Sequence, residues 1–331
     1  MNQFVTGPAA WTGGDFRDRA KWVALLTPAE IGEIEAAARG VAGLALADIA
    51  KANFPLPMLA ARLAQWRETL RSGCGFVLLA GIPVERHGDD MLRAMYVGLG
   101  AHLGISVSQS HRGDYLGDVI DWREDGNERP YRRGGELAMH RDPIDIVGLF
   151  CRRNAKSGGL SRIASAATIW NRFLAERPDL LPAMQDGFRL YRPAADRGAT
   201  AALSEKVPVF TRDADGQLDC WCIPDVIGGA VEKEGEPFGP LAREALDFFN
   251  AVANRPDIYL DMDLQPGDMQ FLNNRVIVHG RTDYVDWPER ERKRHLFRLW
   301  LMCPDWPQPA HRLYLFDNVD RAGGGVAKAT A

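Results

Sequence analysis

Three side chains of the sequence could together hold a metal ion: His140, Asp142 and His279. Residues two apart on a strand project to the same side, so His140 and Asp142 can reach one metal while Arg141 points away. His279 follows the apolar run 276–278 far along the chain. Two imidazoles and one carboxylate hold non-haem Fe(II) on one face and leave positions open for oxygen and a co-substrate. If the three converge, we expect an oxygenase.

The cysteines do not favour a different metal. Thiolates suit zinc or iron–sulfur clusters, and no cysteine is near these three residues in sequence. The number of cysteines is odd and the spacing of the cysteines is not that of a disulfide framework, which predicts reduced thiols in the cytoplasm. Cys220 and Cys222 have no second pair to complete a zinc site, so we interpret them as two alternating residues of a strand. The five are Cys74, Cys151, Cys220, Cys222 and Cys303.

A second cluster of chemical groups lies fifteen residues beyond His279. The segment 293–301 is typical of a strand rich in large apolar groups, with Arg294 and Arg298 on one face. Buried arginines need anionic partners, and a guanidinium matches a carboxylate through two hydrogen bonds of about 1.5–3 kcal/mol each. A dicarboxylate such as 2-oxoglutarate is therefore a natural partner for this strand.

These residues resemble a known family, the Fe(II)- and 2-oxoglutarate-dependent oxygenases of the taurine dioxygenase (TauD/TfdA) type. The resemblance covers most of residues 70 to 305. Its strongest stretches are 136–142 (ELAMHRD), 157–161 (SGGLS), 279–282 (HGRT) and 294–301 (RHLFRLWL). Together these stretches are specific, although any one of them alone would not be.

The resemblance implies a role for each matching residue. It makes His140, Asp142 and His279 the iron ligands and Arg294 the residue that holds the distal carboxylate of 2-oxoglutarate. Ser161 falls where the family places a Ser or Thr hydroxyl on the same carboxylate. Arg141 departs from the family, which usually has a small hydroxyl residue between the two ligands.

Two further positions concern the substrate. Glu136 stands where taurine dioxygenase has an Asn near the substrate amine, and Arg298 matches the position that holds the sulfonate of taurine. An acid and a base so placed suit an amino-acid-like molecule that bears an amine and a carboxylate. The alternatives are that Arg298 pairs with a neighbouring carboxylate, and that Glu136 lies on a solvated rim. The second substrate class is a sulfonate, phosphonate or aryloxy acid.

The expected reaction consumes dioxygen and 2-oxoglutarate, releases succinate and carbon dioxide, and oxidises an unactivated C–H bond. Hydroxylation, desaturation and cyclisation stay open because they depend on substrate placement to within about an ångström. Halogenation is disfavoured, because halogenating relatives replace the ligand carboxylate and Asp142 is intact. A non-catalytic metal-binding jelly-roll sensor is the alternative of another class, but a sensor has no reason to carry Arg294 and Ser161 as well.

Composition limits the partners. The net charge is −4 with both signs interspersed, which argues against nucleic acid. No stretch of about 18 apolar residues predicts a membrane span, and the N-terminus does not resemble a signal peptide. We therefore expect a cytoplasmic enzyme acting on a small molecule, and a homo-oligomer stays open.

The order of elements predicts a mainly β fold with flanking helices (α+β) and a double-stranded β-helix, or jelly roll, at its core. Thr27 followed by Pro28 signals a helix start. Further helices are expected at 56–70, 89–98, 168–175 and 241–253, and strands at 76–80, 146–151, 188–192, 207–211, 258–262, 269–272, 276–279 and 296–302. Short strands without alternating helices favour a jelly roll.

The chain is expected to divide into three parts. Residues 1–70 form an N-terminal arm and helices packed on the core, 71–315 form the catalytic domain, and 316–331 form a disordered tail. The long polar stretches 109–136 and 194–206 are candidate lids, because long loops in compact domains usually serve a site.

Overall fold

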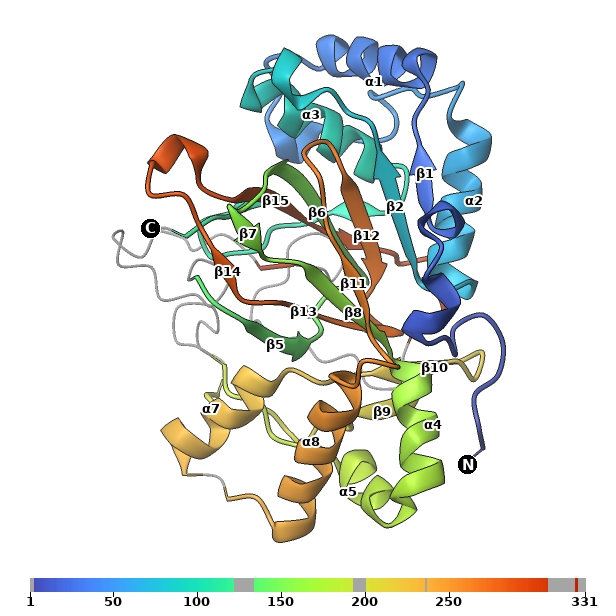
Figure 1. Ribbon diagram of the computed structural model, residues 1–331, viewed down its shortest axis with the longest axis vertical. Coiled ribbons are helices and arrows are strands. Elements are labelled where there is room, and N and C mark those ends of the chain that lie inside the picture. The colour runs from blue at the N-terminus through green and yellow to red at the C-terminus, as the bar shows by residue number, and fades with distance from the viewer. Residues whose placement is uncertain (1–2, 122–133, 193–200, 236, 309–324, 327–331) are drawn as a thin grey trace.

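Two facing β-sheets form the centre of the computed structural model, which describes residues 3–121, 134–192, 201–235, 237–308 and 325–326 (Figure 1). The large sheet has the order β1-β2-β12-β6-β15-β3, with β4 also on β15, and the small sheet has the order β11-β8-β13-β5. The large-sheet strands are β1 (Val23–Leu25), β2 (Phe76–Ala80), β3 (Ile105–Ser106), β4 (Leu116–Val119), β6 (Ile146–Arg153), β12 (Met269–Asn273) and β15 (His295–Met302). The small-sheet strands are β5 (Leu137–His140), β8 (Ser161–Ser165), β11 (Leu260–Met262) and β13 (Ile277–Arg281).

Helices cover the outer face of each sheet (Figure 1). The N-terminal group is α1 (Pro28–Gly40), α2 (Ala60–Ser72) and α3 (Asp89–Gly100), and it packs on the large sheet. The second group is α4 (Ala166–Glu176), α5 (Leu181–Asp186), α7 (Pro224–Glu234) and α8 (Pro240–Ala253), and it packs on the small sheet. Two short pairs of strands complete the fold: β9 (Phe210–Arg212) with β10 (Leu218–Cys220), and β7 (Ser157–Gly158) with β14 (Tyr284–Val285).

Strand alternation divides the core into layers. Along β15, Phe297, Leu299 and Leu301 face the N-terminal helices, whereas Leu296 and Trp300 face the small sheet. On β13, Val278 packs toward the second helical group, while Ile277 lies between the sheets. A period of two therefore places the odd residues of β13 between the sheets, and His279 is one of them.

Most expected elements are present. Thr27 caps α1 in a capping box: its hydroxyl accepts the N–H of Glu30, whose carboxylate accepts the N–H of Thr27 at 2.8 Å. The helices expected at 89–98 and 241–253 are α3 and α8, and the strand expected at 269–272 is β12. The prediction of a mainly β chain with flanking helices around a jelly roll is confirmed.

The region 188–211 differs from the prediction of two strands. Of its described residues, 188–192 and 201–209 form only the isolated bridges Phe188–Val207 and Tyr191–Leu203, and the regular strand β9 begins at Phe210. The apolar residues that suggested strands pack instead against the second helical group. These apolar residues are buried without pairing in a regular sheet. Burial alone therefore gave the same apolar sequence pattern as a strand.

The two candidate lids are only partly described. Residues 109–136 include β4, which pairs with β15, so this part of the stretch is sheet and not a loop. Residues 122–133 and 193–200 lie outside the described residues. Of the tail 316–331, only 325 and 326 are described, and the N–H of buried Val326 donates to the Ser108 carbonyl at 2.9 Å.

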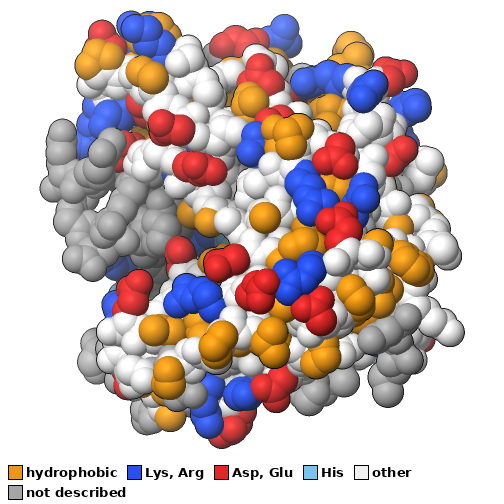
Figure 2. Space-filling model, turned by 60° about the horizontal axis from the view of Figure 1, so that its bottom comes forward, with side chains coloured by type: hydrophobic (Ala, Val, Ile, Leu, Met, Phe, Trp, Pro, Cys, Tyr) orange, Lys and Arg blue, Asp and Glu red, His pale blue; other side chains and the backbone are white. Residues whose placement is uncertain are grey.

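Basic and acidic side chains alternate over the face shown in Figure 2, with no large area of one sign. This agrees with the interspersed charges of the sequence. Among the described residues, no helix combines the length and the apolar character needed to cross a membrane.

Candidate active site

His140 and His279 lie side by side on two adjacent strands. They are direct partners in the antiparallel pairing of β5 with β13, and their ring centroids are 4.4 Å apart. Nδ1 of His140 is 2.8 Å from the carbonyl of Ala138. A carbonyl can only accept, so Nδ1 carries the proton and leaves the Nε2 lone pair of neutral His140 available.

The imidazole of His279 is buried, and its Nε2 has no hydrogen-bond partner among the described residues. Burial lowers the pKa of His279 to about 3, and the neighbouring His140 acts in the same direction. A buried imidazole nitrogen without a partner is uncommon, because leaving it unsatisfied costs free energy. The two rings therefore present nitrogen donors of the kind that a metal ion takes.

Asp142 lies just after the end of β5 and is buried. The indole N–H of Trp300 donates to its Oδ2 at 3.0 Å, and an amino group of Arg298 lies 3.5 Å from both carboxylate oxygens. Burial acts to raise the pKa of Asp142, but the positive charge of Arg298 and the hydrogen bond from Trp300 act in the opposite direction, and that pKa is lowered. The carboxylate is thus kept ionised, as a metal ligand must be.

The donor set fits Fe(II), although the three side chains do not yet converge. Among the described residues no group of three His, Cys, Asp or Glu side chains is arranged to hold a metal ion. The imidazoles of His140 and His279 are adjacent, whereas the Asp142 carboxylate contacts Trp300 and Arg298. Two imidazoles, one ionised carboxylate and an unpartnered buried nitrogen are the ligand chemistry that non-haem Fe(II) uses.

Arg294 precedes β15 and is buried. Its guanidinium donates to the carbonyl of Gly159 at 3.3 Å and lies 5.4 Å from the ring centre of Tyr284. Within the described part of the chain, no carboxylate forms an ion pair with it. Burial lowers the pKa of Arg294 to about 10, and the positive charge of Arg281 contributes. A buried guanidinium without a carboxylate is a site for an anion.

The backbone conformation of Gly159 and its close contact with Arg294 both favour glycine at this position. Its φ of +71° is a conformation that other residues rarely adopt, and a Cβ there would lie 2.9 Å from Nε of Arg294. The absence of a side chain therefore lets the arginine lie against the backbone of the β7–β8 connection. Ser161 follows two residues later, is buried, and donates from Oγ to Oε1 of Gln270 at 3.0 Å.

The two candidate substrate residues occupy different environments. Arg298 is buried, and its Nε donates to Oε1 of Gln109 at 2.9 Å. Its contact with Asp142 corresponds to the alternative in which Arg298 pairs with a neighbouring carboxylate. Glu136 is exposed just before β5, and its charge acts on Arg162. The structure therefore brings Arg298 to the iron-ligand candidates and leaves Glu136 at the surface.

Several residues of the site were not predicted from the sequence. Trp300 was detectable, because it lies two residues after Arg298 and so shares its face of the strand. Gln109, Gln270 and Asn274 gave no such signal, since isolated amides occur throughout soluble chains. Asn274 accepts the N–H of Asp142 at 3.4 Å and lies in the turn between β12 and β13.

Comparison with known proteins decides the family. Residues 41–300 match the model of the Taurine catabolism dioxygenase TauD, TfdA family. The chain belongs to this family. It is also 31% identical over 307 residues to FR-33289 synthase of Streptomyces rubellomurinus, with 90% of each chain covered.

Solved structures share the fold. Asparagine oxygenase in complex with Fe(II), 2S,3S-3-hydroxyasparagine and succinate superimposes with a TM-score of 0.68 at 20% identity, covering 85% of this chain and 93% of the other. The non-heme iron oxygenase OrfP in complex with Fe, succinate and (3S)-hydroxy-L-Arg gives 0.63 at 15% identity, covering 85% and 94%.

Family membership confirms the class predicted from the sequence. The protein is an Fe(II)- and 2-oxoglutarate-dependent dioxygenase with a jelly-roll core. The alternative of a non-catalytic sensor is therefore not needed to explain any feature of the site.

Proposed function

We propose that His140, Asp142 and His279 hold the Fe(II) of this dioxygenase. The cross-strand pair of imidazoles, with the unpartnered buried Nε2 of His279, is the observation that carries this assignment. Asp142 supplies the anionic ligand, and the hydrogen bond from Trp300 keeps its carboxylate oriented. When bound, Fe(II) supplies the reaction of dioxygen with 2-oxoglutarate that gives succinate and carbon dioxide and oxidises a substrate C–H bond.

Arg294 and Ser161 are proposed to bind the distal carboxylate of 2-oxoglutarate. The guanidinium is buried without a described carboxylate partner, so an incoming carboxylate would satisfy it. Gly159 lets this arginine lie against the backbone, two residues before Ser161. Ser161 would exchange its bond to Gln270 for one to the co-substrate, or share its hydroxyl between them.

The substrate is proposed to be a small amino-acid-like molecule, which the enzyme hydroxylates. Arg298, buried beside Asp142, is a cation suited to an acidic group of such a molecule. Glu136, four residues before His140 and exposed, is an anion suited to an amine. Support comes from asparagine oxygenase and OrfP, whose structures hold hydroxylated asparagine and arginine.

A sulfonate or related acid is the second candidate. One observation favours it: the cation Arg298 is buried at the site, whereas the anion Glu136 is exposed. An acid without an amine would need only the first of these residues. Taurine, which the family description names, carries a sulfonate.

Matched compounds would separate the two classes. Succinate formation is measured with L-asparagine and L-arginine, with their analogues that lack the α-amino group, and with taurine. We expect an amino acid to stimulate succinate formation and its deaminated analogue to fail. Stimulation by taurine or by a deaminated analogue, at the rate of an amino acid, would replace the first substrate class with the second.

Charge reversal at Glu136 provides the corresponding protein variant. Glu136→Lys should raise the KM of an amine-bearing substrate about tenfold or more, since one opposite charge becomes a like charge. Glu289→Lys, at an exposed site just before a short helical turn at 290–292, is the matched control and should leave KM unchanged. An unchanged KM in both variants would remove Glu136 from the substrate site.

A further inference from the structure

Arg141 stands between two candidate iron ligands and points away from them. It is buried, with 2% of its surface exposed, and its guanidinium contacts three backbone carbonyls. Nε donates to the carbonyl of Asp142 at 3.3 Å, and the two amino groups donate to Ile144 at 3.3 Å and to Cys220 at 2.9 Å. One side chain thus connects the turn after β5 with the end of β10.

Asp219 balances the charge of Arg141. Its Oδ1 accepts from an amino group of Arg141 at 3.0 Å, and its Oδ2 accepts from the indole N–H of Trp221 at 3.0 Å. The guanidinium stacks 3.9 Å from the ring centre of the same Trp221. Burial raises the pKa of Asp219, although Arg141 and Arg275 act in the opposite direction. An aromatic face, a carboxylate and three carbonyls therefore enclose the cation.

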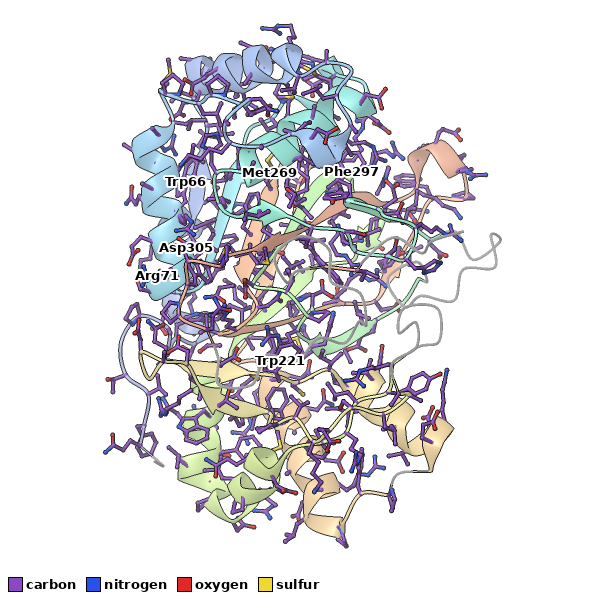
Figure 3. All side chains as sticks on the ribbon, turned by 180° about the vertical axis from the view of Figure 1, so that it is seen from behind. Trp66, Arg71, Trp221, Met269, Phe297 and Asp305 are labelled. Atoms are coloured by element: carbon purple, nitrogen blue, oxygen red, sulfur yellow. The ribbon has the colours of Figure 1, made fainter. Side chains whose placement is uncertain are left out.

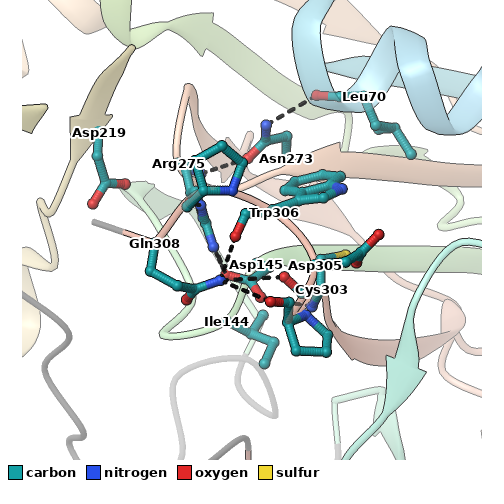
Figure 4. A network of polar contacts seen from close by, with 12 residues as sticks. Leu70, Ile144, Asp145, Asp219, Asn273, Arg275, Cys303, Asp305, Trp306 and Gln308 are labelled. Atoms are coloured by element: carbon teal, nitrogen blue, oxygen red, sulfur yellow. Dashed lines mark hydrogen bonds and ion pairs between the residues drawn. The ribbon is translucent and has the colours of Figure 1, made fainter. Parts of the chain in front are cut away.

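Backbone hydrogen bonds reinforce the same junction. The N–H of Arg141 donates to the carbonyl of Cys222 at 3.0 Å, and the N–H of Cys220 donates to that of Arg275 at 2.9 Å. Arg275 in turn binds Asp145, whose other oxygen accepts the N–H of Cys303 at 2.7 Å (Figure 4). The turn that carries Asp142 is thus held between residues 219–222 and the turn that leads to β13.

We propose that the buried Arg141–Asp219 pair, stacked on Trp221, is a positioning element that sets the orientation of Asp142 for iron binding. The inference rests on the proposed ligand role of Asp142. A lysine would keep the charge but could not reach three carbonyls and a carboxylate with a planar group. The short side chain of a Ser or Thr at this position would not reach Asp219, Trp221 or the Cys220 carbonyl. The partner of Arg141, Asp219, lies in β10, 78 residues further along the chain.

The central test uses a double variant, Arg141→Met with Asp219→Leu. Apolar replacement of both members of a buried ion pair often preserves stability, whereas removal of one member leaves an unpaired charge. We expect the double variant to fold, with a dissociation constant for Fe(II) raised roughly 10- to 100-fold, as is typical for loss of an outer-sphere partner. At saturating Fe(II), the dissociation constant for 2-oxoglutarate should change less than threefold. Arg294→Met should do the opposite: its dissociation constant for Fe(II) should change little, and its dissociation constant for 2-oxoglutarate should rise.

A matched control is available at the other end of the molecule. Arg62 pairs with Glu30 at 2.7 Å and lies 4.8 Å from the ring centre of Trp66, so it combines an ion pair with aromatic stacking. Figure 3 shows Trp66 on the N-terminal helix α2 and Trp221 near the second helical group. Arg62→Met should lower the melting temperature and leave Fe(II) affinity within twofold of the unaltered protein.

A milder variant keeps the proposal testable if the double variant does not fold. Trp221→Phe keeps an aromatic face for Arg141 but removes the hydrogen bond to Asp219, and it should weaken Fe(II) binding severalfold. In the metal-free protein, the amide of Ile144, which donates to the Asp142 carbonyl at 2.8 Å, should exchange hydrogen faster in these variants than in Arg62→Met. Arg141→Lys should recover part of the Fe(II) affinity lost in Arg141→Met.

The outcomes separate this inference from the proposed function. If Asp142→Ala leaves Fe(II) affinity unchanged, the ligand assignment itself is wrong. If Asp142→Ala abolishes binding while the folded double variant and Trp221→Phe both bind Fe(II) within twofold of the unaltered protein, the ligand assignment stands and the positioning role is overturned.

Discussion

The indole N–H of Trp300 donates a 3.0 Å hydrogen bond to Oδ2 of Asp142. Both groups are buried between the sheets, and among the described residues the only other side chain within hydrogen-bond reach of the carboxylate is Arg298, at 3.5 Å. A buried charge-assisted bond of this kind fixes the rotamer of the carboxylate as well as its ionisation. The orientation of the proposed anionic ligand therefore depends on one tryptophan of β15.

Replacing Trp300 with Phe should weaken iron binding. The ring is retained, but the donor to Asp142 is lost, so we expect the Fe(II) dissociation constant to rise about tenfold, within the range for outer-sphere partners. Anaerobic titration with Fe(II) measures this. Trp306→Phe is the control, because the buried N–H of Trp306 has no hydrogen-bond partner among the described residues. Equal Fe(II) affinities in the two variants would contradict the role of Trp300.

Arg294→Met should raise the KM for 2-oxoglutarate at least 100-fold. A charge-assisted pair with a carboxylate is worth roughly 1.5–3 kcal/mol per hydrogen bond, and two such bonds are lost. Gly159→Ala should have a smaller effect in the same direction, because its Cβ would press on Nε of Arg294. Arg162→Met, which removes an ion pair with Asp261 instead, serves as the control. An unchanged requirement in Arg294→Met would transfer the carboxylate-binding role to Arg298.

Tyr96→Phe should stabilise the protein. The Tyr96 hydroxyl is buried against Phe150 and Phe271 and has no hydrogen-bond partner in the described part of the chain, so its removal abolishes a desolvation cost. We expect the free energy of unfolding to rise by about 1 kcal/mol, the low end of the cost of an unsatisfied buried group. Urea unfolding of the metal-free protein measures it. A decrease of similar size would show that the hydroxyl contributes favourable contacts.

Asp118 should make stability depend on acid pH. Burial acts to raise the pKa of Asp118, but the hydrogen bond from His295 and the charge of Arg93 outweigh it and lower that pKa. A carboxyl whose pKa is lower in the folded state contributes stability above its unfolded pKa of about 3.9, and the contribution disappears as pH falls through the folded pKa.

The measurement compares the metal-free protein with Asp118→Asn. The difference in free energy of unfolding should be constant from about pH 7 to pH 5 and should shrink below about pH 4. A difference that grows on acidification would reverse the assigned sign.

The sequence predicted the chemistry of the site better than its geometry. His140, Asp142, Arg294 and Arg298 were recognisable because few functions require these residue types at this spacing. The geometry was less accessible: β5 ends at His140, so Asp142 reaches the site from a turn and not from the same strand. The position of that turn depends on Arg141 and Asp219, which are 78 residues apart. Pairing over such a separation leaves no local pattern in the sequence.

The elements of the fold likewise differ in how well the sequence predicts them. Short runs of apolar residues predicted β12 and β15, because both faces of each strand are buried. The strand β5, of whose four residues only Met139 is buried, gave no such run. The segment 188–192 and the segment 207–211 up to Phe210, where β9 begins, gave a strand pattern without forming a regular strand, because their apolar residues pack against the second helical group.

Anaerobic addition of Fe(II) and 2-oxoglutarate tests the central proposal most directly. Chelation of 2-oxoglutarate by the bound metal should produce a visible metal-to-ligand charge-transfer band in the unaltered protein, and that band should be absent in Asp142→Ala and in His279→Ala while both variants stay folded. A band of full intensity in either folded variant would contradict the assignment of His140, Asp142 and His279 as the iron ligands.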